Sequence, residues 1–251
     1  PDVQQSFFEA IVGEGLLAHH VSNEYGSFSR YCELAKNLSK GKRLQLDVYC
    51  KLATPHFDET EFDAELLRKQ VDAYLSDLAI DQIRFVQWMW RMNPFDDEIR
   101  CARFAESVPI VEDAFARLRR EGKVLEFGCF PYSTRFMNIF SDSGLGQIQV
   151  NYLNFGEIES LEAKAKNLIA IRPFGAGQLG IHSDGESLEE RSLAWVANHP
   201  RVQKVILGLN NIQQLYSARS IMSRALEPEL LVRLESIGRE FRTAARSEAS
   251  Q

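Results

Sequence analysis

Two kinds of segment alternate along the whole chain, and this alternation constrains the fold more than any other feature of the sequence. Short segments rich in β-branched and aromatic residues, typical of strands, occupy 16–21, 44–50, 82–90, 123–130, 147–152, 167–172 and 203–207. Segments with a helical apolar period occupy 2–14, 28–38, 59–78, 107–120, 158–166, 188–198, 212–224 and 227–246. Strands that alternate with helices predict a parallel sheet covered by helices, an α/β fold.

Two architectures have such a sheet, the barrel and the doubly wound open sheet. An open sheet would show a GxGxxG turn after its first strand, whereas the nearest match here, Gly175-Ala176-Gly177, comes late and lacks the third glycine. The chain starts on a helix and has seven predicted strands. We therefore predict a (β/α)8 TIM-type barrel whose first strand is absent from this chain, with residues 1–251 forming a single domain.

Composition excludes several classes of function. The net charge is −6 and no run of Lys or Arg could follow a phosphate backbone, so we expect no nucleic-acid partner. No apolar stretch approaches the roughly 18 residues of a membrane span, so we expect no membrane partner. The four cysteines are widely spaced, which argues against a disulfide framework or a zinc site and favours a reducing, cytoplasmic setting without a bound metal.

Seven segments, in order, carry a resemblance to a known family. They are the stretch ending in Tyr25-Gly26, LQLDVYCKL (44–52), DLAIDQIRFVQWMW (77–90), EGKVLEFGCF (121–130), QIQVNY (147–152), RPFGAGQLG (172–180) and SLAWVANHPRVQKVILGLNNIQQL (192–215). Together they resemble the aldo-keto reductase superfamily from the first helix to about residue 224. The resemblance implies transfer of a hydride from NADPH to the carbonyl carbon of a small-molecule substrate.

The resemblance also implies a catalytic tetrad of Asp, Tyr, Lys and His. Tyr25 takes the place of the Tyr that protonates the carbonyl oxygen, and Lys51 that of the Lys that makes this phenol a better acid. His20 stands where the family has the Asp that holds the Lys, and Met89 where it has the His. A neutral His20 could substitute for the Asp or act itself as an acid, so the catalytic candidates are Tyr25, Lys51 and His20.

The positions that would bind NADPH are only partly retained. The candidates are Gln149 under the nicotinamide, Arg172 at a strand end, Gly175 and Gly177 in the loop that follows it, and Gly208, Asn210 and Asn211 in the phosphate-binding turn. Phe130-Pro131 replaces the Ser-Asn pair that grips the carboxamide, and Ile171 replaces the aromatic residue that stacks on the ring. We therefore expect NADPH to bind weakly.

Several of these residues also have a purely structural interpretation. Tyr25 could be an ordinary loop tyrosine, and Lys51 could pair with Asp47, four residues earlier on the same strand face. His19 and His20 point to opposite faces of a strand, so at most one of them enters a site. Arg172 could form a salt bridge to a loop carboxylate, and we expect Trp88 and Trp90 to lie in the core.

Three functions follow from these observations. The first is NADPH-linked reduction of a small carbonyl compound, weakened or lost. The second is proton transfer on a carbonyl substrate without a cofactor, by an isomerase or dehydratase in which Lys51 and Arg172 bind an anionic group. The third is a non-catalytic binding or partner subunit, because a fold alone does not confer chemistry.

Overall fold

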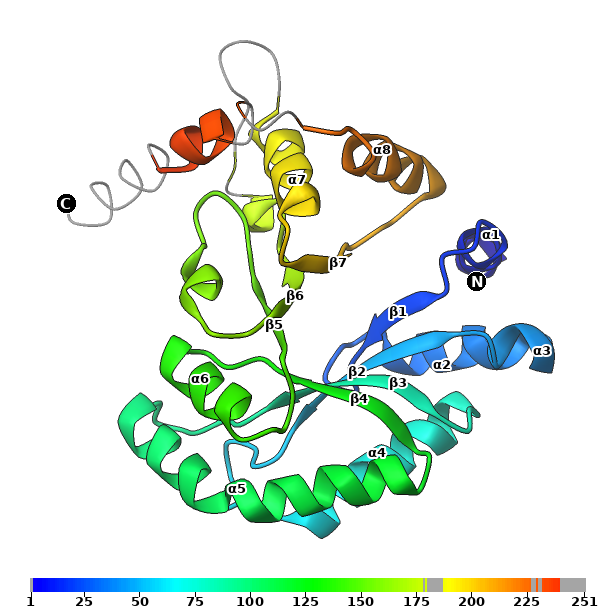
Figure 1. The fold of residues 1–251 in the computed structure, drawn as a ribbon. Coiled ribbons are helices and arrows are strands. Elements are labelled where there is room, and N and C mark those ends of the chain that lie inside the picture. The colour runs from blue at the N-terminus through cyan, green and yellow to red at the C-terminus, as the bar shows by residue number, and fades with distance from the viewer. Residues whose placement is uncertain (1, 178, 180–186, 227–228, 230–231, 240–251) are drawn as a thin grey trace. The chain divides into compact units, whose positions relative to one another are not determined.

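The computed structural model describes residues 2–177, 179, 187–226, 229 and 232–239 (Figure 1). In chain order the elements are α1 (Asp2–Gly13), β1 (Ala18–Val21), α2 (Phe28–Asn37), α3 (Lys40–Arg43), β2 (Asp47–Ala53), α4 (Ala64–Leu78), β3 (Ile83–Met89), α5 (Asp97–Arg120), β4 (Val124–Cys129), α6 (Thr134–Asp142), β5 (Ile148–Tyr152), η1 (Glu159–Glu162), β6 (Asn167–Ile171), η2 (Gly175–Gly177), α7 (Leu188–Asn198), β7 (Val202–Ile206) and α8 (Ile212–Met222). The described residues thus contain the seven predicted strands, ordered in the sheet as they are in the chain. The predicted βα alternation is confirmed.

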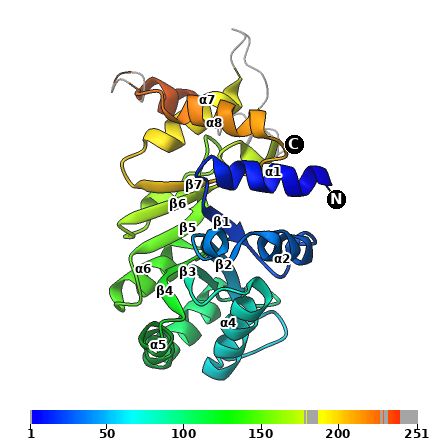
Figure 2. The ribbon, with the colours of Figure 1, turned by 90° about the vertical axis from the view of Figure 1, so that its right-hand side faces the viewer.

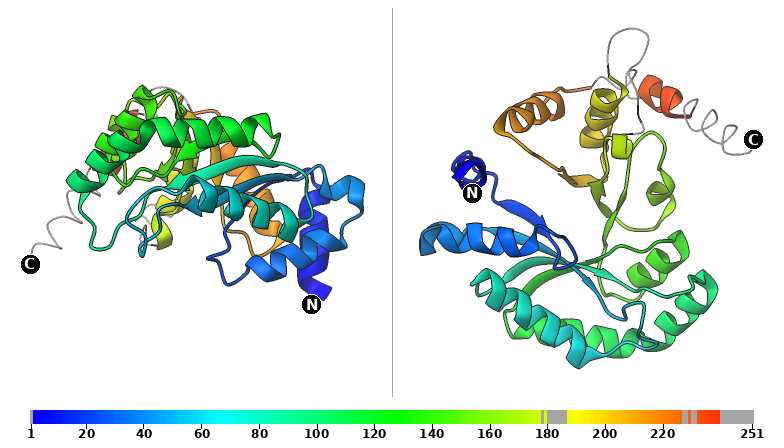
Figure 3. Two further views of the ribbon diagram at one scale, coloured as in Figure 1. Left: turned by 90° about the horizontal axis from the view of Figure 1, so that it is seen from below. Right: turned by 180° about the vertical axis from the view of Figure 1, so that it is seen from behind.

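The chain divides into two compact units, Pro1–Ile148 and Gln149–Gln251. In the first unit, β1, β2, β3 and β4 are paired in parallel, and α4 and α5 run along one face of β2–β4 (Figure 1). Helices α2 and α4 pack against each other, which Figure 3 shows from two further sides. In the second unit, β6 and β7 are parallel and α7 packs beside α8 (Figure 2). The single domain expected over 1–251 stays a prediction.

The core of the first unit is built around Trp88. Its ring lies within about 6 Å, centroid to centroid, of the rings of Phe62, Phe104, Phe115, Phe136 and Phe140. The indole Nε1 donates a hydrogen bond to the Thr54 carbonyl at 2.9 Å, so its polar atom is satisfied. Trp88 and Trp90 are both fully buried, as predicted.

The second unit has its own apolar core. Phe155, Leu168, Trp195 and Leu234 meet in one buried cluster. Leu234 belongs to residues 232–239, which are helical. Apart from residue 229, the rest of the helix predicted over 227–246 lies outside the described residues.

Three predictions of local structure are wrong. Helix α5 begins at Asp97 and not at 107, because the Asp96 side chain caps it by accepting from the Ile99 amide at 2.9 Å. Pro109 lies inside this helix and has no N–H to donate to the Ala105 carbonyl. Both residues are exposed, so water can bind this carbonyl instead.

The other two errors concern short segments. Helix α6 was not expected; Ser133 caps it by accepting from the Phe136 amide at 3.1 Å, and Phe136 and Phe140 bury one side of it. The helix expected over 158–166 is only the single 3-10 turn η1. No helix of the described residues is both long and apolar enough to cross a membrane.

Candidate functional site

Three neighbouring strands of the first unit bring the catalytic candidates together. The register pairs His20 of β1 with Tyr49 of β2, and Lys51 of β2 with Gln87 of β3. Because side chains alternate along a strand, residues 20, 49, 51, 87 and 89 share one face of the sheet. Tyr25 follows β1 in a loop whose backbone bond, Tyr25 N to Ser22 O at 3.0 Å, folds it back toward the strand.

His20 lies between Gln87 and Tyr25. Its Nε2 is 2.8 Å from Gln87 Oε1, and the Gln87 amide nitrogen is 3.7 Å from the sulfur of Met89, which can only accept. This arrangement assigns the proton to Nε2 and leaves the lone pair on Nδ1, which lies 3.5 Å from the Tyr25 hydroxyl. Burial, together with the charge of Lys51, lowers the pKa of His20, so the ring is neutral at neutral pH.

Tyr25 combines access to solvent with a nearby cation. Its side chain is 40% exposed, so water can exchange protons with the hydroxyl. The ammonium of Lys51 lies 5.3 Å from the centroid of its ring. The structure therefore brings together Tyr25 and Lys51, the pair that the family resemblance assigns to proton donation.

Lys51 has a partner that the sequence did not reveal. Its Nζ lies 2.6 Å from Glu24 Oε2, whereas Asp47, the partner expected from strand alternation, is exposed at the start of β2. Glu24 therefore does what the family resemblance assigns to an Asp at the position of His20, namely hold the lysine. The carboxylate comes from the loop after β1 instead of from the strand.

Glu24 also binds Arg91, which follows Trp90 directly after β3. One guanidinium nitrogen of Arg91 bonds Glu24 Oε1 and the other bonds Oε2 at 3.0 Å, so the pair is bidentate. Nε of Arg91 donates to the Tyr132 hydroxyl at 3.2 Å, and Nε2 of His56 lies 3.3 Å from Glu24 Oε1. Partial burial opposes ionisation of Glu24, but its hydrogen bonds to Arg91 and Lys51 outweigh this effect and lower its pKa to about 2.

Glu24, Arg91 and His56 were therefore missed by the sequence analysis. Two of them carried a positional signal, since Glu24 precedes the Tyr25-Gly26 dipeptide and Arg91 follows the motif that ends at Trp90. His56 carried none, because it meets Glu24 through the loop after β2.

The candidate cofactor residues lie in the second unit, where Gln149 has the clearest capacity for a ligand. Gln149 is 1% exposed, and its Oε1 has no hydrogen-bond partner among the described residues. A buried amide oxygen without a partner is costly, and an NH2 donor such as the nicotinamide carboxamide would satisfy it. This residue fits the cofactor that the family resemblance implies.

Arg172 is held by its own loop. Its guanidinium lies 4.1 Å from the centroid of the Tyr152 ring and 4.0 Å from Glu157 Oε1. The structure therefore contains the salt bridge to a loop carboxylate that was the alternative interpretation of Arg172. An anionic ligand at Arg172 would have to compete with Glu157.

The remaining cofactor candidates lie in two places, the glycine loop after β6 and the turn before α8. Gly175 is buried at φ +60°, and Gly177 ends the η2 turn. Gly208 is exposed and has open space around it. The Asn211 side chain accepts from the Gln214 amide at 2.9 Å, and the Gln214 side chain accepts from the Asn210 amide at 2.7 Å. Side chains of the chain itself thus already satisfy two of the amides that a phosphate would use.

Phe130-Pro131 is built into the structure of the first unit. Phe130 is buried, and the Pro131 carbonyl accepts a hydrogen bond at 2.6 Å from Arg100, which is fully buried. The pair offers no side-chain donor or acceptor to a carboxamide. Of the positions that the family resemblance assigns to NADPH, Gln149 thus has a buried oxygen without a partner among the described residues, and Phe130-Pro131 has no polar side chain.

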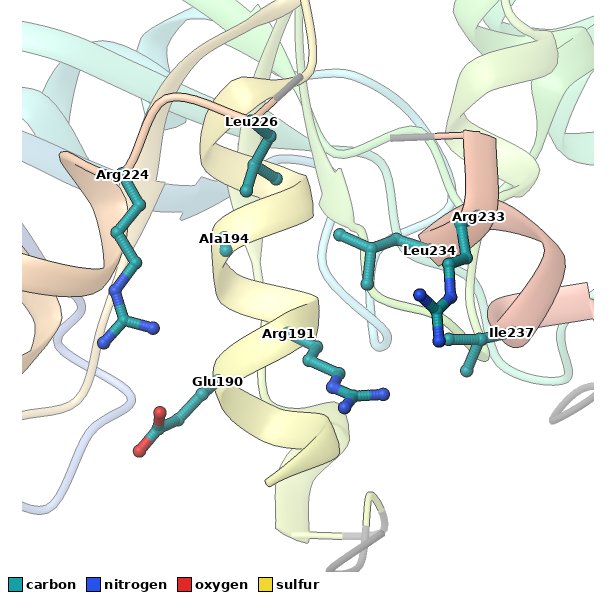
Figure 4. Close-up of a pocket in the computed structure, with 8 residues that line it drawn as sticks. All are labelled: Glu190, Arg191, Ala194, Arg224, Leu226, Arg233, Leu234 and Ile237. Atoms are coloured by element: carbon teal, nitrogen blue, oxygen red, sulfur yellow. The ribbon is translucent and has the colours of Figure 1, made fainter. Parts of the chain in front are cut away.

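Two further features of the structure bear on other kinds of site. Among the described residues, no group of three His, Cys, Asp or Glu side chains is placed to hold a metal ion. A separate pocket of about 280 Å³ in the second unit is lined by four charged and four apolar residues (Figure 4). It is lined by Glu190, Arg191, Ala194, Arg224, Leu226, Arg233, Leu234 and Ile237, none of them a predicted site residue.

The chain is similar to known proteins in structure but not detectably in sequence. No family model and no curated protein matches the chain by sequence. The structure is similar to the holo form of aldo-keto reductase AKR11C1 from Bacillus halodurans, with a TM-score of 0.71 and 13% identity over 92% of this chain and 86% of that chain. It is equally similar to the thermostable aldo-keto reductase Tm1743, in a complex with the inhibitor epalrestat, with a TM-score of 0.71 and 15% identity over 94% of this chain and 87% of that chain. The chain therefore has the (β/α)8-type fold of the aldo-keto reductases, with seven strands in its described residues.

Proposed function

We propose that this chain is an enzyme that reduces a small carbonyl compound with NADPH, and that Tyr25 supplies the proton. The observation that carries the proposal is the position of Tyr25, between the ammonium of Lys51 and Nδ1 of His20 on a reductase-type fold. Bound NADPH would supply a hydride to the carbonyl carbon. Gln149 would hold its carboxamide. The backbone of Gly208 and Asn211 would meet a phosphate, and the Asn210 amide could join them only if the Gln214 side chain released it.

The residues of the first unit account for the proton. The carbonyl oxygen would accept a hydrogen bond from the Tyr25 hydroxyl and take its proton as negative charge develops. The charge of Lys51 would stabilise the resulting phenolate, and Glu24 fixes the position of Lys51 while no substrate is bound. Because Tyr25 is exposed, solvent can return the proton after each turnover.

A titration of the protein with NADPH, followed by fluorescence, tests the proposal. Since Phe130-Pro131 and Ile171 remove expected contacts and each hydrogen bond contributes about 1 kcal/mol, we expect weak binding, some hundredfold weaker than that of a reductase with all its contacts. Gln149→Leu should weaken binding a further fivefold or so by the same arithmetic. Gln203→Leu, on the exposed face of β7, is the matched control.

Two results would overturn this proposal. One is an absence of NADPH binding together with an absence of NADPH oxidation in the presence of aldehydes. The other is equal NADPH affinity in the Gln149→Leu variant and the wild type. Submicromolar affinity would instead refute only the expected weakness.

One specific observation favours a second function, proton transfer without a cofactor. The neutral His20 presents a lone pair on Nδ1 beside the hydroxyl of Tyr25, which makes a base and an acid side by side. An isomerase or dehydratase needs this pair, whereas a reductase needs only the acid. Exchange of the α-protons of a ketone for deuterium without NADPH, lost in His20→Gln, would support this function. If neither reaction is found, a non-catalytic binding subunit is the interpretation that remains.

A further inference from the structure

The groups around Glu24 carry more positive than negative charge. Lys51 and Arg91 supply two cations against one carboxylate, and His56 lies beside it. We call these four residues the Glu24 cluster. The side chains of Lys51 and Arg91 are 16% and 9% exposed, so water screens their excess charge only in part.

The cluster is already arranged to hold a carboxylate. Both oxygens of Glu24 accept from Arg91, Lys51 adds a hydrogen bond at 2.6 Å, and His56 adds a contact at 3.3 Å. Tyr132 fixes Arg91 from its other side by accepting from Nε at 3.2 Å. The planar fork of an arginine fits a carboxylate in this bidentate way.

Glu24 itself can give up this position. It belongs to the exposed stretch 23–27, and its side chain is the most exposed of the three charged members, at 32%. A free carboxylate could take its place on Arg91 and Lys51 while the Glu24 side chain turns to solvent. Lys51 would then be paired with the ligand instead of with the protein.

We infer that the Glu24 cluster binds the carboxylate of a substrate that is a short oxo acid, and that Glu24 occupies this place when no substrate is bound. This inference rests on the proposed function, because it names the substrate class of the same site. Lys51 connects the two parts, since its ammonium lies 2.6 Å from the Glu24 carboxylate and 5.3 Å from the ring of Tyr25. The carboxylate of a bound molecule would lie on Arg91 and Lys51. Its carbonyl oxygen then reaches the Tyr25 hydroxyl only if the carbonyl and the carboxylate are close together in the molecule, as in a short oxo acid.

The test measures binding of pyruvate and of acetone by calorimetry without NADPH. Acetone has the same carbonyl but no charge, so pyruvate should bind and acetone should not. In Glu24→Gln the competing negative charge is gone while the hydrogen-bond acceptor remains, and we expect pyruvate to bind at least about tenfold more tightly. Arg91→Lys keeps the charge but loses the bidentate fork and should weaken pyruvate binding about tenfold or more.

Asp72→Asn is the matched control for the change in net charge. Asp72 accepts from Lys123 at 2.8 Å in the same unit, but there a second carboxylate, Glu121, keeps the lysine paired. This variant should bind pyruvate as the wild type does. Circular dichroism of each variant shows that it is folded before binding is compared.

The possible outcomes separate this inference from the proposed function. If pyruvate binds no better than acetone, or if Glu24→Gln and Asp72→Asn raise its affinity equally, the inference is wrong. If pyruvate binds as expected but NADPH does not bind, the carboxylate site stands and the reductase proposal fails. If the protein reduces uncharged aldehydes with NADPH and shows no preference for oxo acids, the reductase proposal stands and the carboxylate site fails.

Discussion

Glu24 Oε2 and Lys51 Nζ form an ion pair at 2.6 Å. The carboxylate that holds the lysine thus lies four residues beyond position 20, where the family resemblance expects an Asp. Strand β1 carries His20 at the expected position, and the loop that follows β1 supplies the carboxylate. The site thus keeps a Lys held by an acid, and it gains a neutral imidazole that faces Tyr25. A count of tetrad residues in the sequence therefore misses this ion pair.

The Glu24 ion pairs predict a specific loss of stability in acid. The pKa of Glu24 is about 2 in the folded protein against an ordinary 4.5, so its contribution to stability is complete above pH 4.5 and is lost as the pH falls toward 2. Glu24→Gln should therefore lower the melting temperature at neutral pH and make little difference near the folded-state pKa of about 2. Glu33→Gln, which removes an exposed pair with Arg30, is the control and should change little at neutral pH. If the melting temperatures of wild type and Glu24→Gln differ by the same amount from neutral pH down to pH 2, the ionised Glu24 is not the source of this stability.

Removal of the Tyr25 hydroxyl separates chemistry from binding. Tyr25→Phe keeps the ring under Lys51 and deletes only the proton donor, so we expect carbonyl turnover to fall by a factor of about 10²–10⁴ with little change in substrate affinity. Steady-state kinetics together with a binding titration measure the two effects apart. Tyr216→Phe, on the exposed surface of α8, is the control. Unchanged turnover in Tyr25→Phe would rule Tyr25 out as the acid.

The sequence predicted the fold better than it predicted the site, for a physical reason. The strands and long helices are set by local apolar periodicity, which can be read along one segment at a time. The errors fall on α5, which begins ten residues before its expected start at 107, on α6, which is too short for its period to stand out, and on η1, a single turn where a helix was expected over 158–166. The side chain of Asp96 decides the true start of α5, and this cap is a single local hydrogen bond.

The site depends instead on contacts between loops that are distant in sequence. Tyr25, Lys51 and His20 could be named because they lie in motifs on or next to strands. Glu24 and Arg91, 67 residues apart, meet through their side chains, and no local pattern encodes such a meeting. The possible pairing of Lys51 with Asp47 is not found: alternation puts both on one strand face, but four residues of strand separate them by about 13 Å, and Glu24 of the loop holds the lysine instead.

Arg100 should stabilise the folded protein by holding the backbone at Phe130-Pro131, the pair that stands where the family has Ser-Asn. It is fully buried, donates to the Pro131 carbonyl at 2.6 Å and to Asp97 at 2.5 Å, and its guanidinium lies 4.2 Å from the ring centroid of Phe136. Arg100→Met would leave the Pro131 carbonyl without this donor, and we expect a loss of about 3 kcal/mol in the free energy of unfolding. Urea denaturation measures it. Arg103→Met, three residues on along α5 and exposed, should cost far less, and equal losses in the two variants would contradict this role.

Gly175 and Gly208 were both candidates for cofactor binding, and the structure predicts opposite results when each is replaced by alanine. At Gly175 the backbone is left-handed at φ +60°, and a Cβ atom would lie 2.8 Å from Cγ of the buried Leu179, so Gly175→Ala should cost at least about 1–2 kcal/mol of unfolding free energy. At Gly208 a Cβ atom would meet nothing within 4 Å, so Gly208→Ala should leave stability nearly unchanged. Thermal melts of both variants, with and without NADPH, separate packing from binding. If Gly208 contributes to the phosphate turn, its variant should lose stabilisation by NADPH while it melts normally without NADPH. Normal melting of Gly175→Ala would show that the close packing of Gly175 on Leu179 does not hold in solution.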